Sequence, residues 1–136
     1  MAARTAHSPP PVSLLIPGGP GAARQARHAV LERLGNHVSE AVADDLGVVI
    51  SELATNSVVH AEIGPGRYLR VTVGVLEDRL LVTVGDRGSF TVTRLGVSGD
   101  DEAEALGLRL VDHLASSWGV VRDGTGRTQV WCELTL

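Results

Sequence analysis

Hydrophobic and polar residues alternate along the chain with two periods, one typical of helices and one typical of strands. The helical period is clearest over residues 39–61, and Gly64-Pro65-Gly66 ends that helix. Its positions at i, i+3 and i+4 are Leu46, Val49, Ile50, Leu53, Ala54, Ser57 and Val58. The same spacing predicts two further helices, over Gly21–Leu34 and Ala105–Ser116.

Strands are predicted where hydrophobic residues alternate with polar ones. The first is a short edge strand, and the other four form two hairpins. The predicted ranges are Val12–Ile16, Tyr68–Leu76, Arg79–Val84, Trp118–Arg122 and Gln129–Leu136. Because the strands come in consecutive hairpins and do not alternate singly with helices, the sequence predicts an α+β fold with a mixed, mostly antiparallel sheet.

Two segments show neither period. Residues 1–11 contain the run Pro9-Pro10-Pro11 and are predicted to be a disordered tail, which leaves residues 12–136 as one domain. Residues 85–103 hold Gly85, Gly88, Gly96 and Gly99 and are predicted to be a long loop. Loops of this length in compact domains are usually functional lids or disordered segments.

Composition excludes several classes of protein. The chain has 136 residues and a formal net charge of -4, which argues against a protein that coats nucleic acid. With two Trp, one Tyr and one Phe, it also lacks aromatic platforms for single-stranded nucleic acid. No run approaches the roughly 18 apolar residues of a membrane span, and the first residues have no apolar signal core. We therefore expect a cytoplasmic protein that binds neither nucleic acid nor membranes.

Two residue types narrow the chemistry further. All 12 basic residues are Arg, and the absence of Lys excludes a Walker-A loop, a protein-kinase strand lysine and a Schiff-base lysine. Cys132 is the only cysteine, so one chain can form neither a disulfide nor a cysteine zinc cluster. Its place in a strand predicts a buried thiol and not a nucleophile.

The long helix carries the first candidate site. Glu52 and Asn56 are four residues apart, so both project from one face, beside the apolar stripe. Asn is a mediocre helix former, and its place in mid-helix needs an explanation. One interpretation is a polar face with a local hydrogen bond. The other is a carboxylate and an amide oxygen aimed at one metal or water, since Mg²⁺ takes oxygen ligands of this kind.

Three other segments hold candidate residues because they lie at the ends of predicted elements. Asp86 follows the strand predicted to end at Val84, and Gly88 comes two residues later, which places a carboxylate where the chain turns. Gly107 falls in the first turn of the predicted third helix, where the lack of a side chain would let a phosphate approach free N–H groups. Thr128 precedes the last strand. Each of these signals alone also fits an ordinary turn.

The order and spacing of these segments together are more specific. They are Glu52-Leu53-Ala54-Thr55-Asn56-Ser57-Val58-Val59-His60-Ala61, then Asp86-Arg87-Gly88, then Gly107-Leu108-Arg109-Leu110-Val111, then Gly126-Arg127-Thr128. The series resembles the GHKL ATPase superfamily over roughly residues 12 to 136. Within it, the chain looks most like the small stand-alone anti-sigma-factor serine/threonine kinases. The resemblance implies a two-layer α/β sandwich of the Bergerat type.

The resemblance also implies a role for each matching residue. Asn56 corresponds to the asparagine that ligates Mg²⁺, and Glu52 to the glutamate expected to act as general base toward a protein serine. Asp86 corresponds to the aspartate that accepts a hydrogen bond from the adenine amino group. The remaining positions expected to bind ATP are Gly88 beside the base, Gly107 and Leu108 at the end of the lid, and Thr128, which supports the aspartate. Residues 89–104 would be the ATP lid.

The function implied is ATP- and Mg²⁺-dependent phosphorylation of a STAS-type anti-sigma-factor antagonist, or binding of a sigma factor, by a possible homodimer. Two departures from the family pattern keep an alternative open. Ala105 stands where the family's lid usually has the first glycine of a Gly-x-Gly pair, and four acidic residues precede Gly107. These features favour a catalytically weak or inactive module that binds its partner by sequestration.

Overall fold

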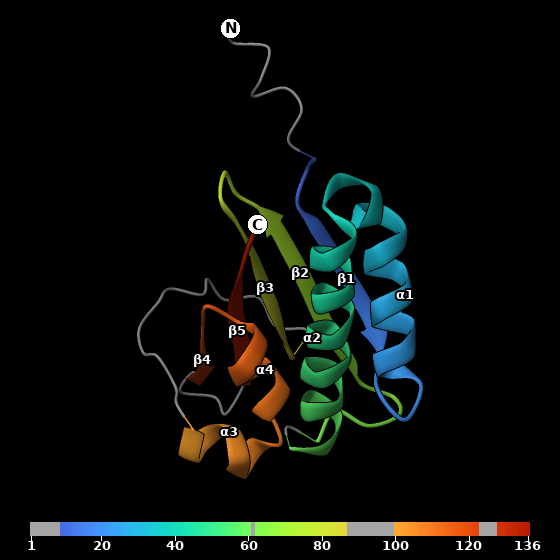
Figure 1. The fold of residues 1–136 in the computed structure, drawn as a ribbon. Helices are drawn as coiled ribbons and strands as arrows, with labels where there is room; N and C mark the ends of the chain where they lie inside the picture. Colours follow the sequence, from blue (N-terminus) through green and yellow to red (C-terminus); the bar gives the residue numbers. More distant parts are fainter. Residues whose placement is uncertain (1–8, 61, 87–99, 123–127) are drawn as a thin grey trace, which may run out of the picture.

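The computed structural model describes residues 9–60, 62–86, 100–122 and 128–136, with side chains from 103 onward in the third of these segments (Figure 1). The elements in chain order are β1 (Val12–Pro17), α1 (Ala22–Leu34), the short 3-10 helix η2 (Gly35–His37), α2 (Glu40–Val59), β2 (Tyr68–Val75), β3 (Arg79–Asp86), α3 (Asp100–Leu106), α4 (Arg109–Leu114), β4 (Ser117–Arg122) and β5 (Thr128–Thr135).

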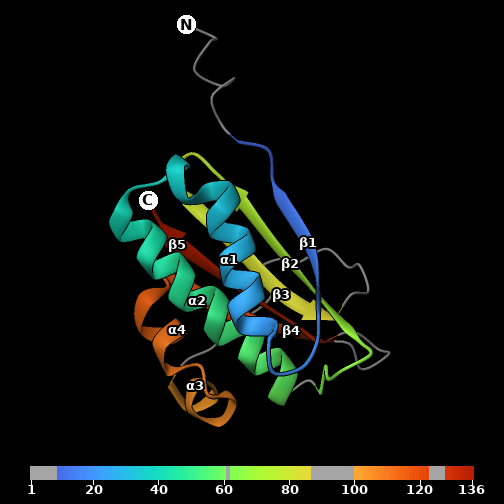
Figure 2. The ribbon, with the colours of Figure 1, turned by 90° about the vertical axis from the view of Figure 1, so that its right-hand side faces the viewer.

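The five strands form one sheet in the order β1-β2-β3-β5-β4. Each of the four neighbouring pairs is antiparallel. Figure 2 shows the helices α1 and α2 in one layer against one face of this sheet. The predicted α+β sandwich is therefore confirmed, and the described strands contain no parallel pair.

The sequence explains why α2 forms and where it lies. The side chain of Ser39 accepts a hydrogen bond of 3.2 Å from the Val42 N–H and caps the first turn. The apolar stripe of α2 then packs on the sheet, and its members Leu46, Val49, Ile50 and Leu53 are completely buried. Gly47 lets α1 approach closely, because a Cβ there would lie 3.3 Å from the Leu31 side chain. Helix α2 therefore contributes a continuous row of buried side chains to the core.

The C-terminal half of the chain departs from the sequence prediction at one place. The single helix predicted over Ala105–Ser116 is wrong, because two short helices, α3 and α4, flank Gly107. Gly107 has a φ of +71° and ends α3, since this left-handed conformation cannot continue a helix. The loop prediction over residues 85–103 is wrong at both ends, because β3 extends to Asp86 and α3 begins at Asp100, and residues 87–99 lie outside the described residues.

Two predicted segments lie mostly outside the described residues. Of the predicted tail, the structure describes Pro9 to Pro11, and of the predicted lid it describes residues 100–104, which belong to α3. Residues 123–127 also lie outside the described residues. Within the described part of the chain, no helix has the length and apolar character needed to span a membrane.

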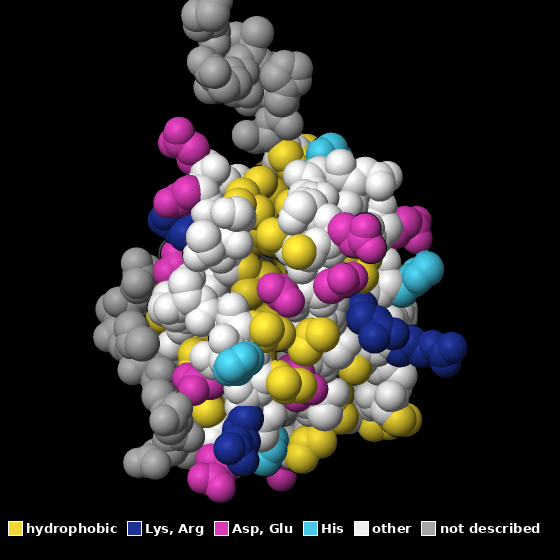
Figure 3. Space-filling view, viewed as in Figure 1, with side chains coloured by type: hydrophobic (Ala, Val, Ile, Leu, Met, Phe, Trp, Pro, Cys, Tyr) yellow, Lys and Arg dark blue, Asp and Glu magenta, His cyan; other side chains and the backbone are white. Residues whose placement is uncertain are grey.

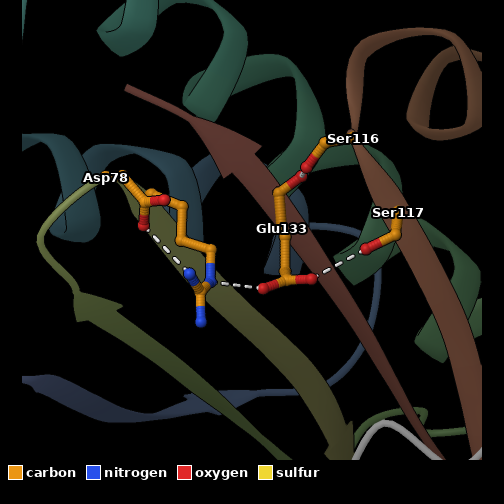
Figure 4. A network of polar contacts seen from close by, with 5 residues as sticks. Asp78, Ser116, Ser117 and Glu133 are labelled. Atoms are coloured by element: carbon orange, nitrogen blue, oxygen red, sulfur yellow. Dashed lines mark hydrogen bonds and ion pairs between the residues drawn. The ribbon is translucent and has the colours of Figure 1, made fainter.

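At the end of the sheet where the chain terminates, an ionic network surrounds the buried Glu133 (Figure 4). Glu133 is 4% exposed, and its carboxylate contacts Arg79 Nε at 2.5 Å and accepts a hydrogen bond of 2.8 Å from the Ser117 hydroxyl. Arg79 also pairs with Asp78 at 2.9 Å. The contacts join β3, β4 and β5, so they fix the sheet at the end away from Asp86.

Cys132 is buried in β5, and burial together with the charge of Glu133 raises the pKa of its thiol from 9.0 to about 12. Above pH 9 the unfolded chain loses this proton while the folded chain keeps it. We therefore expect stability to fall as pH rises from 9 toward 12, by up to about 1.4 kcal/mol per pH unit. Urea denaturation at pH 8, 9 and 10 measures this slope, and Cys132→Ala should lack that part of it.

Candidate functional site

Three parts of the fold converge at one end of the sheet. They are the C-terminal half of α2, the end of β3 with the start of β5, and the junction between α3 and α4 (Figure 1). Most of the candidate residues belong to these three parts. Gly88, predicted to lie beside the adenine base, falls outside the described residues.

Glu52 and Asn56 lie on successive turns of α2, as their spacing predicts. Glu52 is half-buried, whereas Asn56 is only 6% exposed. The Asn56 side chain donates a hydrogen bond of 2.8 Å from Nδ2 to the backbone carbonyl of Leu106. Asn56 is therefore neither an exposed surface residue nor bonded locally within its own helix, and it joins α2 to the end of α3.

Asp86 and Thr128 come together at the edge of the helix-covered face of the sheet. The pairing of β3 with β5 ends at Gly85 opposite Gln129, so Asp86 and Thr128 occupy the next position in register. Both side chains lie on the face of Val84 and Val130, which belong to the core. The two residues thus occupy neighbouring positions on the helix-covered face, at the end of β3 and the start of β5.

Arg67 is a site residue that the sequence analysis missed. Its guanidinium Nη2 lies 2.8 Å from Asp86 Oδ2, and its Nη1 donates to the carbonyl of Glu62 at 3.1 Å. The Arg67 side chain is 54% exposed and that of Asp86 is 22% exposed. Arg67 therefore holds one oxygen of the carboxylate. The register of the β2–β3 hairpin, which pairs Leu69 with Asp86, brings Arg67 beside it, and no local pattern in the sequence indicates this contact.

Replacing Arg67 tests how much this ion pair orients Asp86. Arg67→Ala should weaken ATP binding by up to about fivefold, because exposed pairs of this kind contribute about 0.2–1 kcal/mol. Calorimetric titration with Mg²⁺ and ATP measures the change. Arg70→Ala removes the same charge from β2 at a residue bonded to Ser13, and should leave the affinity unchanged. Equal losses in both variants would show that net charge, and not the ion pair, sets the affinity.

Gly107 and Leu108 lie in the turn between the two short helices. The Leu108 N–H donates to Ala103 O at 2.7 Å and the Gly107 N–H donates to Glu104 O at 3.3 Å, a Schellman arrangement. The expectation that Gly107 lies in the first turn of a helix is wrong. Its N–H and that of Leu108 are engaged by α3, and α4 begins at Arg109. The side chain of Leu108 is buried in the core.

Besides Asn56, His60 also lies close to the turn at Gly107. It is the C-cap residue of α2, and its Nε2 lies 3.8 Å from the place that a Cβ on Gly107 would take. The turn at Gly107 therefore sits over the C-terminal end of α2, next to Asn56. A side chain on Gly107 would have space, but the positive φ would strain it.

A comparison of the sequence with protein-family models decides the family. The model of the histidine kinase-like ATPase domain matches residues 16–133. The chain belongs to this family. The match includes every candidate residue from Glu52 to Thr128, and membership implies that the domain binds ATP. Among curated proteins, none matches the chain significantly.

The residues of this histidine kinase-like ATPase domain suit a nucleotide with a bound Mg²⁺. Among the described residues, no cluster of three His, Cys, Asp or Glu side chains could hold a metal alone. Mg²⁺ commonly takes one or two protein oxygens and completes its shell with water and phosphate oxygens. Asn56 offers such an oxygen, because its Nδ2 is the group bonded to Leu106.

The charge distribution agrees with a need for a cation. Figure 3 shows the helix-covered face, where acidic side chains are spread widely and the basic side chains lie in separate places. The described residues of this face form no continuous basic patch that would neutralise a triphosphate. Within the described part of this face, a bound cation or backbone N–H groups are therefore the groups that could neutralise a triphosphate.

Proposed function

We propose that this domain is an ATP-dependent protein-serine/threonine kinase of the anti-sigma type. It would bind a sigma factor or phosphorylate a STAS-type antagonist of the anti-sigma factor, in the cytoplasm and as a homodimer. The proposal rests on the positions of Glu52 and Asn56, which lie one turn apart on one face of α2. Asn56 contacts the α3–α4 junction through Leu106. A half-buried carboxylate one turn from the expected metal ligand is placed to take a proton from a nucleophile at the phosphate.

The roles of the side chains follow from their positions. Asn56 would hold Mg²⁺ through Oδ1, and the bound Mg²⁺ would neutralise phosphate charge. Asp86, supported by Thr128 and Arg67, would accept a hydrogen bond from the adenine amino group. Glu52 would take the proton from the hydroxyl of the target serine. Phosphoryl transfer needs mainly positioning and charge stabilisation, so this small set of side chains suffices without a lysine.

Partner release would follow from the product of the reaction. A new phosphate adds about -1.5 to -2 charges to the antagonist. The kinase itself has a formal net charge of -4, so the phosphorylated partner would meet a surface of the same sign. The antagonist would then dissociate while the kinase becomes available to another partner.

Nucleotide binding is the step to test first. Titration calorimetry with ATP and Mg²⁺ should give saturable binding, and Asn56→Ala should abolish it. Thr55→Ala is the matched control, because Thr55 is the exposed neighbour of Asn56 on the same helix and should leave binding intact. Absence of heat at millimolar ATP with the unmodified protein would overturn the kinase proposal.

A second candidate function, sequestration of a partner without catalysis, is favoured by the turn at Gly107. The N–H groups of Gly107 and Leu108 are bonded to α3, and Ala105 stands exposed just before them. Helix α3 is rich in acidic residues, since its sequence is Asp-Asp-Glu-Ala-Glu-Ala-Leu. A pure binding module would keep its partner affinity in Asn56→Ala, and its partner would acquire no phosphate.

A further inference from the structure

The Asn56 carboxamide makes a contact that the proposed role of a metal ligand does not require. Its Nδ2 donates at 2.8 Å to the carbonyl of Leu106, a residue 50 positions later in the chain. Leu106 is the last residue of α3. The hydrogen bond is partly buried, since Asn56 is 6% exposed and Leu106 is half-buried.

The turn at Gly107 explains why the Leu106 carbonyl is available. A helix end leaves several carbonyls without partners inside the helix. The turn satisfies two of them internally, because the N–H groups of Leu108 and Gly107 bond to Ala103 and Glu104. The carbonyl of Leu106 faces α2, and Asn56 supplies its donor. Asn56 thus caps the C-terminal end of α3 from a different helix.

This contact also fixes the orientation of the amide. A carbonyl oxygen accepts only from the NH₂ group, so Nδ2 must point toward Leu106 and Oδ1 must point away from it. Among the described residues, no donor reaches Oδ1, although the residue is largely buried. The Asn56 carboxamide therefore presents an unused oxygen in a fixed direction.

We propose that this carboxamide couples metal binding to the α3–α4 junction: Oδ1 takes the Mg²⁺ of the bound nucleotide while Nδ2 holds Leu106. This inference rests on the proposed function, because it needs a Mg²⁺–nucleotide site at Asn56. A cation at Oδ1 withdraws electron density from the amide and makes its N–H groups stronger donors. Metal binding therefore tightens the hold on Leu106, and by linkage a junction held in place favours metal binding.

Asn56→Asp separates the two halves of the carboxamide. The aspartate has nearly the same shape and keeps an oxygen for the metal, but its carboxylate cannot donate to Leu106. Hydrogen exchange of the backbone amides of residues 103–114 is compared at pH 8, where the carboxylate is ionised. Without ligand, these amides should exchange about three- to tenfold faster in Asn56→Asp than in the unmodified protein. Thr55→Asp adds the same charge one residue away, on the exposed face, and should leave exchange unchanged.

The second part of the experiment adds ligand. In the unmodified protein, ATP with Mg²⁺ should slow exchange at the junction further than ATP with EDTA. In Asn56→Asp, ATP with Mg²⁺ should bind without this extra protection. Gly107→Ala is a second variant. It strains the backbone of the turn, because Gly107 has a positive φ, and it leaves Asn56 unchanged. It should also speed exchange at the junction without ligand.

The outcomes distinguish this inference from the proposed function. Equal exchange in all variants without ligand would overturn the contact between Asn56 and the junction, whether or not ATP binds. Faster exchange in Asn56→Asp and Gly107→Ala, with no ATP binding to the unmodified protein, would support the contact and overturn the nucleotide site. Binding of ATP with Mg²⁺ that leaves junction exchange unchanged would overturn the coupling alone.

Discussion

Glu52→Gln should lower the rate of phosphate transfer by about 10²- to 10⁴-fold while leaving the affinity for ATP nearly unchanged. The loss is the size expected when a positioned general base is removed. Gln has the shape of Glu but cannot take a proton from the serine hydroxyl. Glu52 lies one turn before Asn56 and is half-buried, so the substitution leaves the metal ligand and the core of α2 in place. Transfer of labelled phosphate from ATP to a STAS-type antagonist measures the rate.

The control uses the same substitution on the same helix. Glu40 is exposed in the first turn of α2, far along the helix from Asn56, and Glu40→Gln should leave transfer intact. Unchanged transfer in Glu52→Gln would exclude Glu52 as the base. A protein that never transfers phosphate, yet keeps its partner in both variants, would instead be the sequestration module.

Helix α2 and the hairpins could be predicted from sequence because their signals are local. The stripe that includes Leu46, Ile50 and Leu53 repeats without a break, and those residues are buried as expected. Ser39 at the N-cap and the alternation of β2 and β3 also depend only on neighbouring residues. Such patterns define which face of an element enters the core. They also placed Glu52 and Asn56 on one face of the helix.

The α3–α4 region was predicted less well because one glycine permits two outcomes. A glycine inside an apolar helical pattern either lies in the helix or ends it. The sequence period continues across Gly107, but its φ of +71° divides the segment into two short helices. What decides between them is the packing of Leu108 into the core and the bond from Asn56 to Leu106. Neither contact has a local sequence signal.

The partners of the site residues were out of reach for the same reason. Arg67 lies 19 positions before Asp86, and Leu106 lies 50 positions after Asn56. Helical and strand periods relate residues that are close in sequence, whereas these pairs form only after the sheet and helices have packed. The buried Glu133 is a similar case, because its partner Arg79 is brought near by the register of β3 with β5. Resemblance to a family can name a functional residue, but it does not show what holds that residue in place.

Gly85→Ala should destabilise the domain and disrupt the adenine end of the site together. A Cβ on Gly85 would lie 2.5 Å from the backbone oxygen of Thr128 and 2.7 Å from the Cα of Gln129. Both obstacles are backbone atoms, so β3 and β5 must move apart. Overpacking of this kind costs about 1–3 kcal/mol. The residues displaced first are Asp86 and Thr128, which follow in the same register, so ATP affinity should fall by tenfold or more.

Gly74→Ala is the matched control for this substitution. Gly74 also lies in a strand, in β2, but a Cβ there would have nothing within 4 Å. Its substitution should change stability by no more than about 0.5 kcal/mol in urea denaturation and leave ATP affinity unchanged. Loss of affinity in Gly85→Ala without loss of stability would mean that the alanine acts at the ligand itself. If Gly85→Ala is destabilised but keeps its full ATP affinity, Asp86 and Thr128 do not recognise adenine. Strand ends that have moved apart could not hold the same base between them.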